Sequence, residues 1–103
     1  MLKLLVLYSQ DVEKNRGFYE ALGFAFQKEQ HGNGPLHYSC PVGDVIFEIY
    51  PGKDASKLRL GFKLEKLEEV LFLLEKNGFA VKKRGNGTTF VHDPEGRVVE
   101  LYS

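Results

Sequence analysis

The sequence predicts an α+β protein built from two tandem βαβββ modules, whose strands form a curved, cup-like mixed sheet with the helices on its outer face. Three observations support this fold class. The 103 residues are the length of one small domain. Short segments of the first half recur in the second half. In each half, one helical pattern is followed by three short strand patterns.

Two segments carry the internal repeat. Gly23-Phe24-Ala25 returns 55 residues later as Gly78-Phe79-Ala80, and Glu48-Ile49-Tyr50 returns 52 residues later as Glu100-Leu101-Tyr102. Because both pairs keep their order at nearly the same offset, the chain repeats one supersecondary unit. We expect a single domain over 1–103, with module one at 1–52, a linker at about 51–56 and module two at 57–103.

The first module is predicted to contain a strand, a helix and three further strands. Residues 2–8 form a short apolar strand pattern. Asp11 can cap the helix that follows, and Gly23 is suited to end it. Turns containing glycine separate the remaining strands, which we expect at 24–29, 36–40 and 45–50.

The second module repeats this order. Residues 57–64 alternate between apolar and other side chains, which is typical of a strand with one buried face. A helix should follow and end at Gly78, because apolar residues recur at helical spacing at Leu67, Val70, Leu71 and Leu74. The last three strands are expected at 79–83, 88–92 and 97–102.

The charge balance and the apolar runs exclude several functional classes. The chain has 14 Lys+Arg and 14 Asp+Glu, so it lacks the basic surplus of a nucleic-acid-binding domain. Its apolar runs are far shorter than the roughly 20 residues of a membrane helix, and residues 1–7 do not resemble a secretory signal. We therefore expect a cytoplasmic protein without nucleic-acid or membrane partners. The single cysteine, Cys40, cannot form an internal disulfide.

Two motifs resemble those of a known family. Asp11-Val12-Glu13 leads to Phe18-Tyr19 and Leu22-Gly23-Phe24, and Asp93-Pro94-Glu95-Gly96 is followed by Val99-Glu100-Leu101. In this order, and on a duplicated βαβββ pattern, they resemble the vicinal oxygen chelate superfamily of glyoxalase I, bleomycin-resistance proteins, fosfomycin-resistance enzymes and extradiol dioxygenases. The resemblance covers essentially the whole chain. It implies the fold more strongly than an activity, since one architecture hosts many functions.

The resemblance also implies where a metal ion would bind. The family takes one ligand from the first strand and one from the last strand of each module. The corresponding positions here are Leu4, Glu48, Arg59 and Glu100. Leucine has no lone pair and a guanidinium is a permanent cation, so two of the four positions cannot bind a divalent ion. We therefore expect no metal cofactor. The alternative is a divalent metal bound by Glu48, Glu100 and His37.

Strand alternation, counted outward from these positions, assigns the residues to two faces. The face toward the helices is predicted to be apolar and to contain Leu5, Leu7, Val45, Phe47, Ile49, Leu58, Leu60, Phe62, Val99 and Leu101. The concave face is predicted to contain Leu4, Val6, Tyr8, Ile46, Glu48, Tyr50, Arg59, Gly61, Lys63, Val98, Glu100 and Tyr102.

The candidate site residues lie on this concave face. Glu48 and Glu100 need compensation in the middle of apolar strands, and Arg59 is the partner best suited to supply it. This arrangement is either a structural ion pair or a ligand anchor: Arg59 and Lys63 would bind an anionic group, and the glutamates a cationic one. Three aromatic rings are expected on the same face, where they either line the site or fill it: Tyr8, Tyr50 and Tyr102. Among the histidines, we include His37 alone as a candidate.

We expect a metal-free protein of the glyoxalase and bleomycin-resistance type that binds or sequesters a small molecule and forms a homodimer. No catalytic residue is assigned. The alternative is a metal-dependent lyase or transferase resembling glyoxalase I or the fosfomycin-resistance enzymes. A third hypothesis is an accessory module that binds no small ligand.

Overall fold

A computed structural model describes residues 1–53 and 58–103. The chain divides into two compact units, called unit 1 and unit 2 below, and the boundary between them falls inside the remaining segment. The predicted linker lies partly outside the described residues, as does Lys57, where the second module was expected to begin. The single domain and the cup that both sheets would form together stay predictions.

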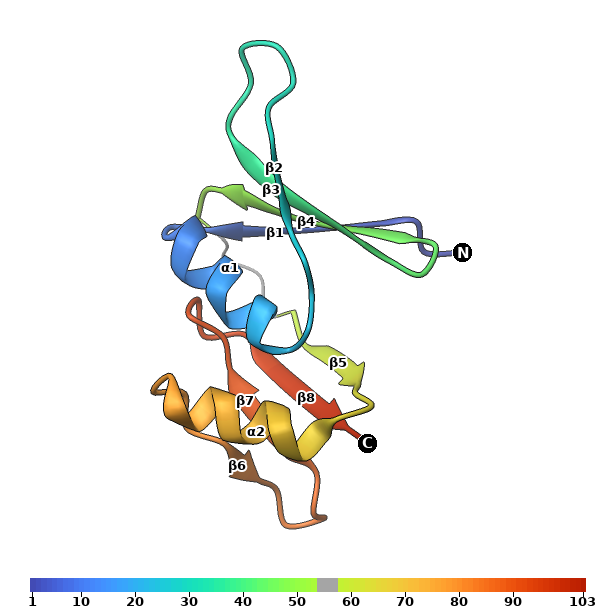
Figure 1. Ribbon diagram of the computed structural model, residues 1–103, viewed down its shortest axis with the longest axis vertical. Coiled ribbons are helices and arrows are strands. Elements are labelled where there is room, and N and C mark those ends of the chain that lie inside the picture. The colour runs from blue at the N-terminus through green and yellow to red at the C-terminus, as the bar shows by residue number, and fades with distance from the viewer. Residues whose placement is uncertain (54–57) are drawn as a thin grey trace. The chain divides into compact units, whose positions relative to one another are not determined.

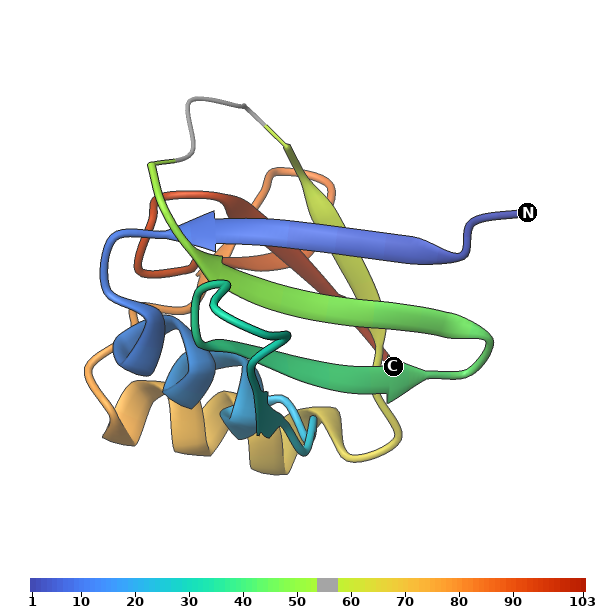
Figure 2. The same ribbon diagram turned by 90° about the horizontal axis from the view of Figure 1, so that it is seen from above.

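Unit 1 contains one helix and a mixed four-stranded sheet (Figure 1). The strand order is β1-β4-β3-β2, with β1 parallel to β4 and the other neighbours antiparallel (Figure 2). The elements in chain order are β1 (Leu4–Ser9), α1 (Val12–Ala21), β2 (Gln27–Glu29), β3 (His37–Val42) and β4 (Val45–Pro51).

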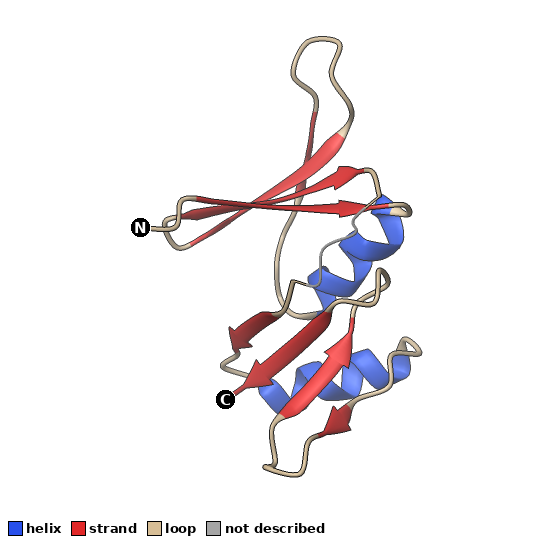
Figure 3. Cartoon of the chain, turned by 180° about the vertical axis from the view of Figure 1, so that it is seen from behind, coloured by secondary structure: helices blue, strands red, loops and turns tan. Residues whose placement is uncertain are grey.

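Unit 2 repeats this arrangement (Figure 3). Its strand order is β5-β8-β7-β6, again with one parallel pair, β5 and β8. The elements are β5 (Leu60–Lys63), α2 (Leu67–Lys76), β6 (Lys82–Lys83), β7 (Thr89–His92) and β8 (Val98–Tyr102). The predicted pair of βαβββ modules is confirmed.

Helix α1 has the cap and the buried side chains that the sequence predicts. The Asp11 side chain accepts a hydrogen bond from the backbone N–H of Lys14 at 3.0 Å. Gly23 follows the helix with a φ of 111°, a conformation that favours glycine. The buried Tyr19 ring packs edge-to-face on Phe47 of β4, with 5.2 Å between the ring centroids. Aromatic packing therefore attaches α1 to its sheet.

The edge strands are shorter than predicted. β1 begins at Leu4 instead of residue 2, and β5 covers Leu60–Lys63 instead of 57–64, of which Lys57 lies outside the described residues. β2 begins at Gln27 instead of residue 24, and β6 contains two residues instead of five. For β2 the reason is aromatic packing, because Phe24 and Phe26 both lie against Phe47, with centroids 5.6 and 5.4 Å away. These partly buried side chains pack on Phe47 of the core, and the ladder between β2 and β3 begins only after them.

The predicted alternation of faces is confirmed in both sheets. Leu7, Phe47 and Ile49 are buried in unit 1, and Val99 and Leu101 are buried in unit 2. The residues between them are partly or fully exposed. We call the sheet face opposite the helix the open face of each unit. Among the described residues, no helix has the length and apolar character needed to cross a membrane.

A buried ion pair organises the turn between β7 and β8. One carboxylate oxygen of Asp93 accepts hydrogen bonds from the backbone N–H groups of Glu95 and Arg97, at 2.9 and 3.0 Å. The other oxygen accepts the Arg97 Nε–H at 2.8 Å, and both side chains are buried. The charge-assisted contacts and the two turn hydrogen bonds hold the Asp93-Pro94-Glu95-Gly96 motif in shape.

Replacing Asp93 with alanine is expected to destabilise the protein by about 3 kcal/mol or more, because the substitution leaves a buried guanidinium without its partner. Denaturant unfolding of the full chain measures this loss. Asp44→Ala is the matched control, since Asp44 is an exposed residue in the turn between β3 and β4. An equal effect of the two substitutions would contradict the structural role of the Asp93 ion pair.

Candidate functional site

Each open face carries a cluster of polar side chains around a central glutamate. In unit 1, the β-ladders place Glu48 on the same face as Tyr50 and, on the neighbouring strands, His37 and Glu29. We call Glu29, His31, His37 and Glu48 the imidazole cluster. In unit 2 the corresponding group surrounds Glu100, and we call Arg59, Arg84, Glu100 and Tyr102 the arginine cluster.

His37 is the most confined member of the imidazole cluster, with 1% of its side chain exposed. Its ring stacks on the ring of Tyr50, with centroids 4.1 Å apart and planes inclined by 7°. The Nδ1 atom lies 3.2 Å from the carbonyl oxygen of Pro35. A carbonyl oxygen can only accept, so Nδ1 carries a proton and donates it to this oxygen.

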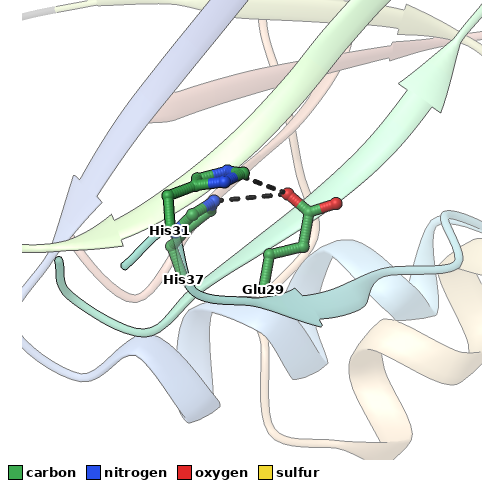
Figure 4. Close-up of side chains that lie close together, drawn as sticks. All are labelled: Glu29, His31 and His37. Carbon is green, nitrogen blue, oxygen red and sulfur yellow. Dashed lines mark ion pairs between the residues drawn. The ribbon is translucent and has the colours of Figure 1, made fainter. Parts of the chain in front are cut away.

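The other ring nitrogen of His37 faces two carboxylates. Nε2 lies 3.3 Å from Oε1 of Glu29 and 3.5 Å from Oε2 of Glu48. Nε2 of His31 lies 3.7 Å from the same oxygen of Glu29 (Figure 4). Residues of β2, β3, β4 and the turn between β2 and β3 therefore bring two imidazoles and two carboxylates together.

Tyr50 and Tyr8 extend this open face. Burial, followed by the negative charges of Glu48 and Glu29, raises the pKa of the Tyr50 hydroxyl. Tyr50 therefore remains a neutral phenol over a wide pH range. The Tyr8 ring lies 6.2 Å from the Tyr50 ring and is half exposed. The two rings offer an apolar surface next to the charged groups.

In the arginine cluster, three side chains contact one carboxylate. Oε1 of Glu100 accepts a hydrogen bond from Nη2 of Arg59, and Nη2 of Arg84 lies 3.7 Å from the same oxygen. The Tyr102 hydroxyl donates to Oε2. The Arg84 guanidinium also lies over the Phe90 ring, 4.6 Å from its centroid. The cluster therefore combines two cationic groups, one anion and two aromatic rings.

These contacts change the ionisation of the arginine cluster. The hydrogen bond from Tyr102 lowers the pKa of Glu100 against the opposing effect of burial, and the charges of Arg59 and Arg84 lower it further. The same hydrogen bond, followed by burial and the Glu100 charge, raises the pKa of Tyr102. Glu100 is therefore ionised at neutral pH, and its charge is compensated by at least one arginine.

Equivalent positions of the two clusters carry opposite charges. In unit 1, Glu29 and His37 are partners in the ladder of β2 and β3. His37 lies two residues before Ser39, the residue of β3 that pairs with Glu48. In unit 2, Thr88 lies two residues before Phe90, the partner of Glu100, and therefore corresponds to His37. The N–H of Arg84 donates to the Thr88 carbonyl at 2.9 Å, so Arg84 occupies the position that corresponds to Glu29. The duplicated fold thus presents an acid with two imidazoles on one sheet and an arginine pair on the other.

The structure brings the predicted site residues together within each unit. His37, Glu48, Tyr50 and Tyr8 are neighbours in unit 1, and the expected pairing of Arg59 with Glu100 is present in unit 2. Lys63 lies opposite Tyr102 in the β5–β8 ladder. Their role in binding a ligand stays a prediction.

Sequence reasoning missed Glu29, His31 and Arg84. The signal for Glu29 was available: in a hairpin whose turn begins at His31, Glu29 and His37 fall on paired positions of neighbouring strands. His31 lies in a glycine-rich turn and Arg84 ends a short basic run, and neither local pattern indicates a partner.

The metal position implied by the family resemblance does not fit these residues. Leu4 is half exposed and has no donor atom. Arg59 places a cation against Glu100 where the family has a ligand. Of the alternative set Glu48, Glu100 and His37, the contact between Glu48 and His37 lies within unit 1, and the set as a whole stays a prediction.

Replacing Tyr102 with phenylalanine is expected to raise the pKa of Glu100, because it removes the hydrogen bond that lowers this pKa most. A carboxyl whose pKa is lowered by folding stabilises the fold above its unfolded pKa and loses that contribution as the pH falls through the folded pKa. Carboxyl ¹³C NMR titration measures the shift, with Tyr8→Phe as the control. An unchanged Glu100 titration in Tyr102→Phe would contradict this account.

Comparison with protein-family models finds no match, and comparison with curated proteins finds none either. Solved structures do resemble the chain. The fosfomycin resistance protein FosX from Mesorhizobium loti matches with a TM-score of 0.77 and 17% identity, covering 99% of this chain and 90% of that one. A possible glyoxalase from Bacillus cereus matches with a TM-score of 0.74 and 25% identity, covering 100% and 98%.

A third structure extends this group. It is a mutant FosX from Listeria monocytogenes, complexed with Mn(II) and 1S,2S-dihydroxypropylphosphonic acid, with a TM-score of 0.77 and 14% identity over 99% of this chain and 90% of that one. All three likenesses extend over nearly the full length of both chains. The chain therefore has the fold of the vicinal oxygen chelate superfamily, as its two sequence motifs and its duplicated βαβββ pattern indicate.

Proposed function

We propose that this protein binds or sequesters a small organic anion, and that the arginine cluster of unit 2 is its anchor. The observation that carries the proposal is the convergence of Arg59 and Arg84 on one carboxylate. Two guanidinium groups against one glutamate leave a surplus positive charge on the open face. Arg59 is 62% exposed and has further N–H donors that a ligand can use.

The chemistry of the cluster suits a carboxylate or phosphonate group. A guanidinium binds such groups through parallel N–H···O contacts, which determine the orientation of the ligand as well as its charge. Lys63, next to Tyr102 in the ladder, adds a second kind of cation. The rings of Tyr102 and Phe90 would contact the apolar part of the ligand.

The comparisons supply one supporting observation. The similar FosX structure from Listeria monocytogenes contains a small phosphonic acid. A shared fold does not transfer a substrate, so the class of ligand proposed here rests on the arginine cluster. The proposal does not require a metal at the family position, because Leu4 and Arg59 replace two of its ligands.

A metal-dependent lyase or transferase is the second candidate function. The contact of His37 with Glu48 favours it, because an imidazole next to a carboxylate is a common pair of metal ligands. In either case we propose a cytoplasmic homodimer without nucleic-acid or membrane partners. This arrangement would bury additional surface of a chain of this small size.

Titration of the full chain with small carboxylates and phosphonates tests anion binding. We expect NMR shift changes at Arg59, Arg84 and Tyr102, and we expect Arg59→Gln or Arg84→Gln to weaken binding by about tenfold or more, since a charge-assisted hydrogen bond is lost. Arg16→Gln is the matched control, because Arg16 pairs with Glu13 and Glu20 on helix α1.

Two results would overturn the proposal. One is the absence of shift changes on β7 and β8 with every anion tested, which would favour an accessory module without a small ligand. The other is an affinity that both arginine substitutions leave unchanged, which would mean that the anion binds elsewhere on the protein.

A further inference from the structure

The imidazole cluster contains a buried nitrogen without a hydrogen-bond partner. Within the described part of the chain, Nε2 of His37 makes no hydrogen bond, although the side chain is almost fully buried. Because Nδ1 donates to Pro35, a neutral ring has its lone pair on Nε2. That lone pair faces the carboxylates of Glu29 and Glu48, so three electron-rich groups point toward one another.

Such an arrangement is unfavourable unless a positive charge lies among the three groups. Either Nε2 carries a second proton or a cation binds between the groups. The presence of a second imidazole distinguishes these possibilities. Nε2 of His31 faces the oxygen of Glu29 that already faces His37. A second proton on His37 would not account for the position of His31, whereas a cation bound among these groups would.

We propose that Glu29, His31 and His37, with Glu48 as the fourth ligand, bind a divalent transition metal ion of the zinc class. Three contacts of the cluster approach the geometry of such a site, and Glu48 joins it through its contact with His37. In a tetrahedral zinc site, neighbouring ligand atoms lie about 3.3 Å apart. The contacts here measure 3.3 Å between His37 and Glu29, 3.5 Å between His37 and Glu48, and 3.7 Å between His31 and Glu29. The ligand atoms of Glu29, His31 and His37 all lie within 4.8 Å of one another.

The surroundings hold the ligands in place before a metal arrives. The Pro35 carbonyl determines the tautomer of His37, a role that outer groups commonly play for metal-bound histidines. Stacking on Tyr50 fixes the orientation of the ring. The turn that carries His31 is closed by a hydrogen bond from the Gly34 N–H to the His31 carbonyl at 2.9 Å. Gln30 binds the Gly34 carbonyl from the other side at 2.8 Å.

The donor set indicates the class of metal. Two imidazole nitrogens with carboxylate oxygens suit zinc, copper, nickel or iron, whereas calcium and magnesium prefer oxygen donors alone. His31 is 76% exposed and provides access for the ion from solvent. All four ligands belong to unit 1. The site therefore differs from the family position, which draws ligands from both modules, and the two have only Glu48 in common.

Titration of tag-free, metal-stripped full-length protein with Co²⁺ and Zn²⁺ tests this site. We expect one metal ion per chain, with the visible absorption of four-coordinate cobalt, and NMR shift changes at His31 and His37. His31→Ala and Glu29→Gln should each weaken metal binding by about tenfold or more. Even the loss of a residue that only hydrogen-bonds to a metal ligand has an effect of about this size, and these two residues are proposed to bind the metal directly. His31 is exposed, so its substitution is expected to leave the fold intact.

Two variants serve as controls. His92→Ala removes an exposed histidine of unit 2 outside the cluster, and Glu100→Gln removes the carboxylate that the family position requires. Both should retain metal affinity. The proposal is overturned if no saturable one-to-one binding occurs, if His31→Ala and Glu29→Gln bind as the unmodified protein does, or if Glu100→Gln abolishes binding. Metal binding and anion binding are measured separately, so either proposal can fail alone.

Discussion

A glutamate in the middle of a central strand is the constraint on which both open faces depend. Glu48 lies on β4 and Glu100 on β8, each between apolar residues, and their side chains are 14% and 12% exposed. An uncompensated carboxylate in such a place costs several kcal/mol. Each unit therefore surrounds its glutamate with groups that donate protons or carry positive charge, and these groups provide the chemistry of the face.

The two units meet this requirement in different ways. Unit 2 uses two guanidinium groups and a phenol, all of which are donors at neutral pH, so its glutamate is fully paired. Unit 1 places an imidazole and a second carboxylate next to its glutamate, which leaves lone pairs facing one another. The first arrangement pairs its glutamate with donors, and we propose that it attracts anions, whereas we propose that the second binds a cation. Duplication of one module has thus produced two faces of different chemistry.

Most of the fold could be predicted from the sequence, because its elements depend on local periodicity. The strict alternation in the strands of Glu48 and Glu100 assigned their residues to the correct face, whereas Leu58, which was predicted to face the helix, is exposed and lies before β5. The caps at Asp11 and Gly23 marked the ends of α1. The errors lie at edge strands, where packing of Phe24 and Phe26 against Phe47 decides where the ladder begins. Such packing joins residues that are far apart in sequence, so local patterns do not reveal it.

The sequence alone determined which face each strand residue occupies, since successive side chains of a strand point to opposite sides. It also determined that the two glutamates need partners. The sequence proposed Arg59 as a partner, but only the tertiary structure decided that it pairs with Glu100 and which other residues join it, because these groups come from neighbouring strands and turns. Arg59 contacts Glu100 across 41 positions of the chain, and Glu29 and His31 meet His37 through the register of one hairpin. Strand pairing and turn conformation, which no residue specifies by itself, bring these groups together.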